Sequence, residues 1–180
     1  MATRNILKDG DKGLSKKSRV VTDFNNRLHL LLDDMRETLI EANGLGLAAP
    51  QVGVLRRVAL IVDTNVEAES VDEQIIELIN PEIISREGEV TCSEGCLSLP
   101  GVYGIVTRPE FVKIRAQDRH GVAFELDGAE ITARALCHEI DHLDGIVFTS
   151  IAERLLTEEE LAELAAQNEQ NEIEAEEEKQ

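Results

Sequence analysis

The stretch that decides the fold spans residues 133–145 and reads ARALCHEIDHLDG. Its apolar residues recur at helical spacing, and Thr132 and Gly145 are suited to cap the two ends of the expected helix. Within it, His138 and His142 are four residues apart and share one helix face. Two such imidazoles can bind one metal ion, beside which Glu139 can move protons. An ordinary amphipathic helix with two exposed histidines would show the same pattern, so a third ligand decides between the two interpretations.

The candidate third ligand is Cys96, which lies within the segment EGCLSLPG at residues 94–101. One thiolate and two imidazoles leave one tetrahedral position open for water, which is typical of a catalytic site. Two alternatives remain open from the residues. Cys92 would complete a closed four-ligand zinc site with C-x₃-C and H-x₃-H spacing, and Cys137 adjoins a ligand and would compete with Cys96. Free cysteines are also commonly just buried.

Composition indicates one globular domain with an acidic surface. The 180 residues are 42% hydrophobic and contain no apolar run that could span a membrane. Half of the net charge of −18 lies in residues 157–180, where ten Glu and one Lys occur. This charge disfavours binding to DNA or RNA, because phosphate contacts need Lys and Arg. The polar N-terminus and the three cysteines indicate a reducing cytoplasm and no disulfide framework.

A Gly-rich segment, GLGLAAPQVG, occupies residues 44–53. Small residues let a backbone approach a ligand closely, and the Gln51 amide can donate a hydrogen bond to an oxyanion. A phosphate-binding loop is disfavoured, because the Lys-Ser/Thr pair of a Walker motif is missing. A tight turn between a helix and a strand would explain the same composition.

Helices are expected near both ends of the chain, with strands between them. A helix capped by Thr22 or Asp23 is predicted to end at Asn43. Residues 157–160, TEEE, form a capping box that begins a short C-terminal helix, and residues 168–180 are expected to be disordered. Strands are expected at residues 57–63, 75–80, 82–92, 111–116 and 122–126, with a hairpin turn at residues 118–121. This order predicts an α+β fold.

Three segments taken together, GLGLAAPQ at residues 44–51, EGCLS at 94–98 and HEIDH at 138–142, resemble the signature motifs of peptide deformylases. The resemblance runs from about residue 4 to residue 155. It implies mostly antiparallel strands wrapped around a central HExxH helix, in a single catalytic domain at residues 1–156. An acidic C-terminal helix and tail would follow at residues 157–180. The implied reaction is hydrolysis of the N-formyl group of the N-terminal formylmethionine of newly synthesised polypeptides, with release of formate.

The resemblance assigns metal ligation to Cys96, His138 and His142, and general acid/base catalysis to Glu139. One divalent ion would be bound, which is commonly Fe²⁺ in the family, with Zn²⁺, Ni²⁺ or Co²⁺ as alternatives. A hydrolase of this class uses the metal to activate water, which suits the poorly electrophilic formamide.

The resemblance also implies how the substrate is held. The Gln51 side chain and the Leu97 backbone N–H would donate to the formyl oxygen. Gly44, Leu45 and Gly46 would bind an extended peptide by backbone hydrogen bonds, like an added strand. From position alone, we also expect residues 94 and 108, a Glu and an Arg, to pair behind the Cys96 ligand.

Partners follow from the same resemblance. The substrates would be N-formylmethionyl nascent peptides close to the ribosome. Some family members dock on the ribosome through a basic C-terminal helix, but here residues 157–180 are acidic, so we expect no docking by this route. The lack of a transit peptide favours a bacterial cytosol. Two other classes share the HExxH pattern: a structural zinc module that uses Cys92, and a general HExxH endoprotease, whose third ligand typically lies downstream of the motif.

Overall fold

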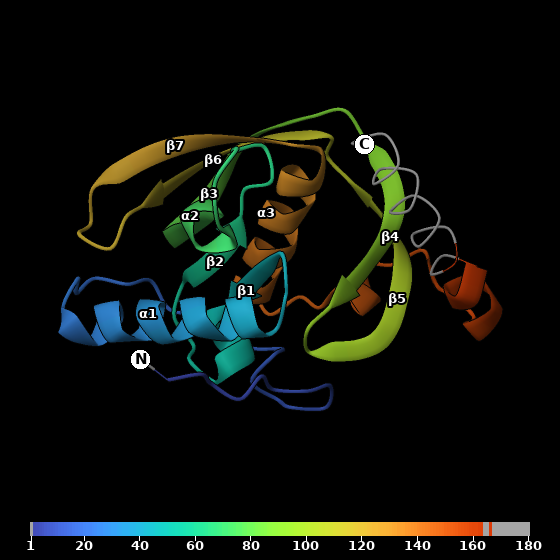
Figure 1. Cartoon of the computed structure of the whole chain (residues 1–180), viewed down its shortest axis with the longest axis horizontal. Coiled ribbons are helices and arrows are strands. Elements are labelled where there is room, and N and C mark those ends of the chain that lie inside the picture. Colours follow the sequence, from blue (N-terminus) through green and yellow to red (C-terminus); the bar gives the residue numbers. More distant parts are fainter. Residues whose placement is uncertain (1, 164–165, 167–180) are drawn as a thin grey trace.

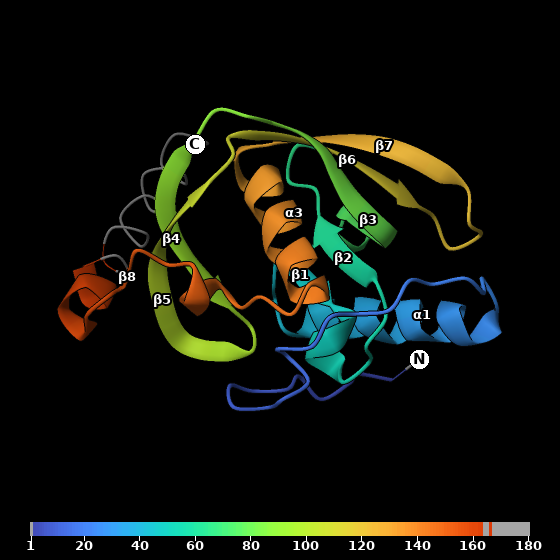
Figure 2. The same cartoon turned by 180° about the vertical axis from the view of Figure 1, so that it is seen from behind.

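Helix α3 (Glu130–Leu143) carries His138 and His142 and lies between two antiparallel sheets (Figures 1 and 2). The computed structural model describes residues 2–163 and 166, so the expected disorder of residues 168–180 lies outside the described part of the chain. The expected α+β fold, with strands wrapped around the central HExxH helix, is confirmed.

The larger sheet has five strands in the order β1-β2-β3-β6-β7, and each neighbouring pair is antiparallel. Its strands are β1 (Gly46–Ala48), β2 (Val58–Val62), β3 (Ile75–Glu87), β6 (Phe111–Gln117) and β7 (Ala123–Ala129). The smaller sheet has the order β4-β5-β8, with β4 (Val90–Cys96), β5 (Leu99–Arg108) and β8 (Arg154–Leu155). Strands β1 and β4 are therefore edge strands of different sheets.

Strand β2 shows why the larger sheet is buried on both faces. Leu60 packs in a core cluster with residues of helix α1 (Asn26–Glu41), whereas the next residue, Ile61, packs with residues of α3. Successive strand side chains point to opposite faces, so α1 and α3 cover the two faces of this sheet. All five residues of β2 are buried, as expected for a strand that is covered on both sides.

Shorter elements complete the described chain. They are the 3₁₀ helices η1 (Ala49–Val52) and η2 (Phe148–Ser150) and the single helical turn α2 (Val71–Gln74). Residues 158–163 are helical, and the expected capping box is confirmed: Glu160 N–H donates to Thr157 Oγ1 at 3.3 Å, and Thr157 N–H donates to Glu160 Oε2 at 2.9 Å. No helix within the described residues has the length and apolar character needed to cross a membrane.

Both main helices begin at other residues than expected. Asn25, rather than Thr22 or Asp23, caps α1, because its side chain accepts hydrogen bonds from the N–H groups of the first turn. Helix α3 begins at Glu130, and Thr132 lies inside it, where its buried hydroxyl donates to a strand-end carboxylate instead of capping the helix. The helix ends as expected, with Gly145 at a φ of 76° just past it.

The strand boundaries before β4 also differ from the expectation. Residues 75–80 and 82–92 do not form two strands separated at Asn80. Asn80 has a φ of 53° and marks a shift in the register of β3, which runs on to Glu87. The chain turns at Gly88, where φ is 66°, and β4 follows. The expected strands near residues 57–63, 111–116 and 122–126 and the turn at residues 118–121 are confirmed.

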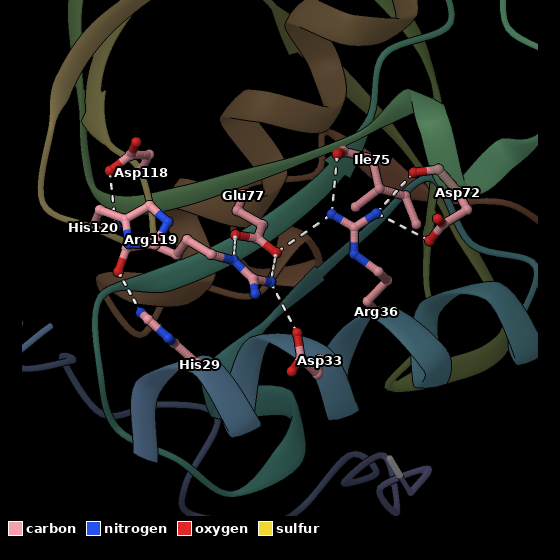
Figure 3. A network of polar contacts seen from close by, with 9 residues as sticks. All are labelled: His29, Asp33, Arg36, Asp72, Ile75, Glu77, Asp118, Arg119 and His120. Atoms are coloured by element: carbon pink, nitrogen blue, oxygen red, sulfur yellow. Dashed lines mark hydrogen bonds and ion pairs between the residues drawn. The ribbon is translucent and has the colours of Figure 1, made fainter. Parts of the chain in front are cut away.

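A group of ion pairs fastens α1 to the larger sheet, and we name it the Glu77 cluster (Figure 3). Glu77 of β3 accepts hydrogen bonds from Arg119 Nε at 2.9 Å and from Arg36 Nη2 at 3.3 Å. Arg119, in the turn between β6 and β7, also contacts Asp33 of α1 at 2.9 Å. Arg36 of α1 contacts Asp72 of α2 at 3.0 Å. The cluster joins α1, the contiguous α2 and β3, and the turn between β6 and β7, which are three segments distant in sequence.

Candidate active site

Helix α3 and the end of strand β4 bring the three expected ligand residues together. The Nε2 atoms of His138 and His142 are 3.1 Å apart, and Cys96 Sγ is 3.2 Å from His142 Nε2. The three ligand atoms all lie within 4.8 Å of one another. A tetrahedral ion with metal–nitrogen bonds of about 2.0–2.1 Å and metal–sulfur bonds of about 2.3 Å separates its donors by about 3.3–3.6 Å. The donor set therefore fits one divalent metal ion.

The protonation of these residues also fits a metal site. His142 is 1% exposed and His138 is 8% exposed, and their Nε2 atoms face each other. Burial disfavours a charge on His138, yet hydrogen bonds to Cys96 and Glu94 raise its pKa. Burial lowers the pKa of His142, and the neighbouring His138 lowers it further. Two Nε2 lone pairs that face each other repel unless a cation lies between them. Without a metal ion, one proton shared by the two Nε2 atoms would take that place.

A carboxylate and a guanidinium orient His138 from behind. His138 Nδ1 donates to Glu94 Oε1 at 2.5 Å, which directs the Nε2 lone pair toward the other ligands. Arg108 donates to both Glu94 oxygens, at 2.7 and 2.9 Å, and to Asp141 Oδ2 at 2.6 Å. We name Glu94, Arg108 and Asp141 the Glu94 cluster. The expected Glu94–Arg108 pair is thus present, but it contacts His138 rather than Cys96.

Sequence reasoning did not single out Asp141, although a signal was available. It lies three residues after His138, so both side chains share one side of α3. Arg108 is 6% exposed, and its three nitrogen atoms all donate to carboxylates. Burial disfavours charge on Arg108 and on Glu94, yet their mutual hydrogen bonds raise the pKa of Arg108 and, together with His138, lower that of Glu94 to about 2. Both groups therefore stay charged.

Glu139 lies on the cleft side of α3, where the backbone of β1 approaches it closely. A Cβ atom on Gly46 would lie 2.7 Å from the Glu139 carboxyl carbon, so any larger residue there would displace the Glu139 side chain. Glu139 is 3% exposed, and its Oε2 atom has no hydrogen-bond partner among the described residues. Burial raises the pKa of Glu139 to about 7. Such a carboxyl can both accept and release a proton near neutral pH.

Gln51 is fixed by three contacts that orient its amide. Its Oε1 atom accepts from Ala48 N–H at 2.8 Å, while its Nε2 atom donates to Ser98 Oγ at 3.2 Å and approaches Cys96 Sγ at 3.5 Å. The NH₂ group therefore faces the ligand cluster. The Leu97 N–H makes no hydrogen bond to any other residue that the structure describes.

A cleft of about 650 Å³ adjoins these residues, between the edge strands β1 and β4. A Cβ atom on Gly44 would lie 2.8 Å from Leu97 Cδ1, so the Gly-rich segment and the EGCLS segment touch. Half-exposed apolar side chains lie along the cleft, namely Leu45, Tyr103 and Ile131. The expected site residues that line it are Gly44, Leu45, Gly46, Gln51, Cys96, Leu97, His138 and Glu139.

The remaining cysteines are outside the ligand group. Within the described residues, the Cys/His/Asp/Glu group that could hold a metal consists of Cys96, His138 and His142. Cys92 Sγ instead accepts from Arg134 Nη1 at 2.7 Å, so the closed four-ligand interpretation is wrong. Cys137 packs in the core between α3 and the larger sheet, where burial raises its pKa to about 11. It cannot compete for the ion.

Three protein ligands leave one position of a tetrahedral ion open, and a buried carboxyl lies beside them in a cleft. This fold and site define a metal-dependent hydrolase. A model of the family "Polypeptide deformylase" matches residues 3–157. A peptide deformylase of Caldicellulosiruptor bescii is 49% identical over 174 residues, which cover 97% of this chain and 100% of that protein.

Two further comparisons agree. A peptide deformylase of Lachnoclostridium phytofermentans is 55% identical over 148 residues, covering 82% of this chain and 88% of that protein. The crystal structure of a peptide deformylase from Legionella pneumophila superposes with a TM-score of 0.77 at 37% identity and covers 99% of both chains. The chain belongs to the peptide deformylase family. Its activity is therefore that of a metal-dependent amidohydrolase that removes N-formyl groups, and the endoprotease alternative is wrong.

Proposed function

We propose that the chain deformylates the N-terminal formylmethionine of newly synthesised polypeptides in a bacterial cytosol, with Fe²⁺ as its native metal. The observation that carries the proposal is the convergence of three ligand atoms within 4.8 Å of one another in the cleft that also holds Glu139. One soft thiolate and two imidazoles suit Fe²⁺, and they suit Zn²⁺, Ni²⁺ or Co²⁺ as well. The natural substrates are formylated nascent peptides.

Glu139 acts as the general acid and base in this proposal. When bound, the metal ion supplies Lewis-acid chemistry, which makes water a stronger acid and polarises the formyl group. Glu139 accepts the proton of the attacking water and then gives it to the departing amine nitrogen. Its burial and its raised pKa support both steps.

Gln51 and Leu97 stabilise the negative charge that develops on the formyl oxygen. The Gln51 amide is held with its NH₂ group toward the ligands, which supports a role as donor. The Leu97 N–H has no acceptor among the described residues and lies in a segment that borders the cleft. Preorganised donors of this kind need no rearrangement during the reaction, which is the source of their effect on rate.

The substrate peptide binds as an extended strand between β1 and β4. Both strands are edges of their sheets and present unpaired backbone groups to the cleft. Gly44, Leu45 and Gly46 contribute the backbone on one side, and glycine at two of these positions lets this backbone lie close to Leu97 and Glu139. The exposed Leu45 side chain supplies an apolar contact for the methionine side chain.

The catalytic domain corresponds to residues 1–156 in this proposal, and residues 157–180 are an acidic extension. The family model ends at residue 157, which supports this division. Ten Glu and one Lys in the extension disfavour contact with ribosomal RNA. We therefore expect the full chain and a chain that ends at residue 156 to pellet equally with ribosomes at every salt concentration. Loss of salt-sensitive binding in the shorter chain would contradict this expectation.

Formate release from formyl-Met-Ala-Ser tests the reaction. The wild type and Glu139→Gln are loaded anaerobically with Fe²⁺, and the metal content of each is measured. We expect turnover by the wild type and loss of about 10²–10⁴ in rate for the variant at equal metal content, because general acid–base catalysis is lost. A metal-replete wild type without turnover would refute the proposed substrate, and an active variant would refute the role of Glu139.

A further inference from the structure

The N-terminal segment crosses both loops that carry the proposed oxyanion donors. Leu7 N–H donates to the Gln51 carbonyl oxygen at 2.7 Å, and Asp9 N–H donates to the Ser98 carbonyl oxygen at 3.1 Å. Neither contact belongs to a sheet, and each joins residues that are more than forty positions apart. The segment thus ties the Gly-rich loop to the EGCLS loop at one end of the cleft, which Ile6 and Lys8 help to line.

Lys8 lies between these two contacts and makes a third. Its ammonium donates to the Leu97 carbonyl oxygen at 2.9 Å, over a sequence separation of 89 residues. Lys8 also lines the cleft and is exposed, as is usual for lysine. An exposed hydrogen bond of this kind adds little to the free energy of unfolding, so its effect would fall on local geometry.

The turn that Lys8 contacts joins strands β4 and β5 of the smaller sheet. Cys96 pairs with Leu99, so Leu97 and Ser98 form the tip between β4 and β5, next to a shift in strand register. The favoured two-residue hairpin turns require positive φ at their first central residue. Leu97 and Ser98 are absent from the described residues with positive φ, so this turn is not one of those two favoured types.

The carbonyl groups at such a tip cannot bond within the ladder. Leu97 C=O instead accepts from Lys8, and Ser98 C=O accepts from Asp9. Gln51 holds the turn from the opposite side through Ser98 Oγ. Of these anchors, Lys8 alone acts on the residue whose N–H is the proposed donor, since the others act on its neighbour.

We propose that Lys8 is a positioning residue of the active site, an inference that rests on the proposed role of the Leu97 N–H. The ammonium holds the Leu97 carbonyl, which fixes the conformation of the turn and aims the Leu97 N–H at the formyl oxygen. The contact strengthens when a bound peptide covers the cleft and excludes water, because hydrogen bonds to charged groups are stronger in a lower dielectric.

Three variants test this inference: Lys8→Met, Lys8→Arg, and Lys12→Met as the control. Lys12 is an exposed lysine of the same segment that does not contact Leu97. Each Fe²⁺-loaded full chain is assayed with formyl-Met-Ala-Ser. Loss of an oxyanion donor costs about 10²–10³ in rate, so loss of a group that only positions the donor is expected to lower kcat of Lys8→Met about tenfold. KM, metal content and the thermal midpoint should match the wild type.

The conservative variant and a spectroscopic measurement separate positioning from a general effect of charge. Lys8→Arg should recover most of kcat, and Lys12→Met should retain it. In ¹⁵N-labelled zinc-loaded protein, relaxation dispersion at the Leu97 and Ser98 amides should show new microsecond–millisecond exchange in Lys8→Met alone. Wild-type kcat in Lys8→Met, an equal loss in Lys12→Met, or loss of metal in Lys8→Met would overturn the inference. A metal-replete but inactive wild type would instead contradict the proposed function itself.

Discussion

Two arginine–carboxylate clusters of the same chemistry lie in different parts of the molecule. In the Glu94 cluster, two nitrogen atoms of Arg108 donate to the two oxygens of Glu94, which also contacts the metal ligand His138. In the Glu77 cluster, Arg119 also donates to both oxygens of Glu77, between α1 and the larger sheet (Figure 3). The Arg108 side chain is 6% exposed and that of Arg119 is 30% exposed.

The difference lies in what each carboxylate does next. Glu94 Oε1 accepts hydrogen bonds from both Arg108 and His138 Nδ1. Arg108 therefore holds the carboxylate that orients the His138 ring at the metal site. Besides Arg119, Glu77 contacts a second arginine, Arg36. Arg36 in turn contacts Asp72 of α2 at the surface. One cluster therefore supports a ligand, whereas the other supports the packing of a helix. Substitutions in the Glu94 cluster should therefore lower metal affinity, whereas substitutions in the Glu77 cluster should lower only the free energy of unfolding.

The largest effect is expected for Arg108→Met. It removes the arginine that pairs with both Glu94 and Asp141, whose side chains are 10% and 25% exposed. Breaking a buried ion pair in this way costs about 3–5 kcal/mol of unfolding free energy. Urea unfolding of the metal-free protein measures this cost, and zinc titration should show weakened binding in the same variant. An unchanged unfolding free energy would mean that Arg108 contributes no more to stability than an exposed arginine does.

A smaller and more selective effect is expected for Glu94→Gln. The amide keeps the shape but loses the charge that orients His138, so affinity for zinc should fall about 10–100-fold. Competition with a chelator of known affinity measures the change. Equal affinity in variant and wild type would mean that the Glu94 carboxylate does not orient the ligand.

The same carboxylate gives a pH signature. Burial opposes ionisation of Glu94, but hydrogen bonds from His138 and Arg108 lower its pKa from 4.5 to about 2. The unfolded state therefore binds a proton first as the pH falls, and the stability that Glu94 contributes is lost between about pH 4.5 and pH 2. The unfolding free energy of the metal-free wild type should fall more steeply in that window than that of Glu94→Gln. Parallel curves would contradict this assignment.

The smallest effect is expected for Glu77→Gln. Its side chain is 10% exposed, but its two arginine partners are 25% and 30% exposed and remain hydrated after the change. We expect a loss of about 1 kcal/mol of unfolding free energy, with kcat and zinc affinity unchanged. Arg115→Gln, which breaks an exposed pair with Glu125, serves as the control and should stay within about 0.5 kcal/mol of the wild type. A loss of zinc affinity in Glu77→Gln would erase the distinction between the clusters.

The sequence predicted the parts of the site that depend on local spacing. His138 and His142 share a helix face at a fixed separation, and Cys96 followed from the order of three motifs. The contact of Glu94 with His138 was not predicted, because it depends on how β4 packs against α3. The contact of Asp141 was missed for the same reason, since its partner, Arg108, belongs to β5 of the smaller sheet.

The fold shows the same division. Strand β2 was predicted because its continuous apolar run is itself a signal. Strand β5 was not, because Pro100, Gly101 and Gly104 weaken the strand pattern, and its pairing with β4 forms it instead. The start of α3 was placed too late, because Thr132 looks like a cap in sequence but is drawn to Asp63 by tertiary packing. Tertiary contacts thus decide where local signals are weak or ambiguous.

The origin of the ligands in two separate layers has a consequence for folding. Cys96 ends a strand of the smaller sheet, whereas His138 and His142 belong to the helix that packs on the larger sheet. A bound ion therefore acts as a cross-link between the smaller sheet and α3, in addition to the contacts of Glu94 with His138 and of Arg108 with Asp141. Its release removes one of these links, so amide hydrogens of the smaller sheet should exchange with solvent faster in the metal-free protein than in the metal-loaded protein.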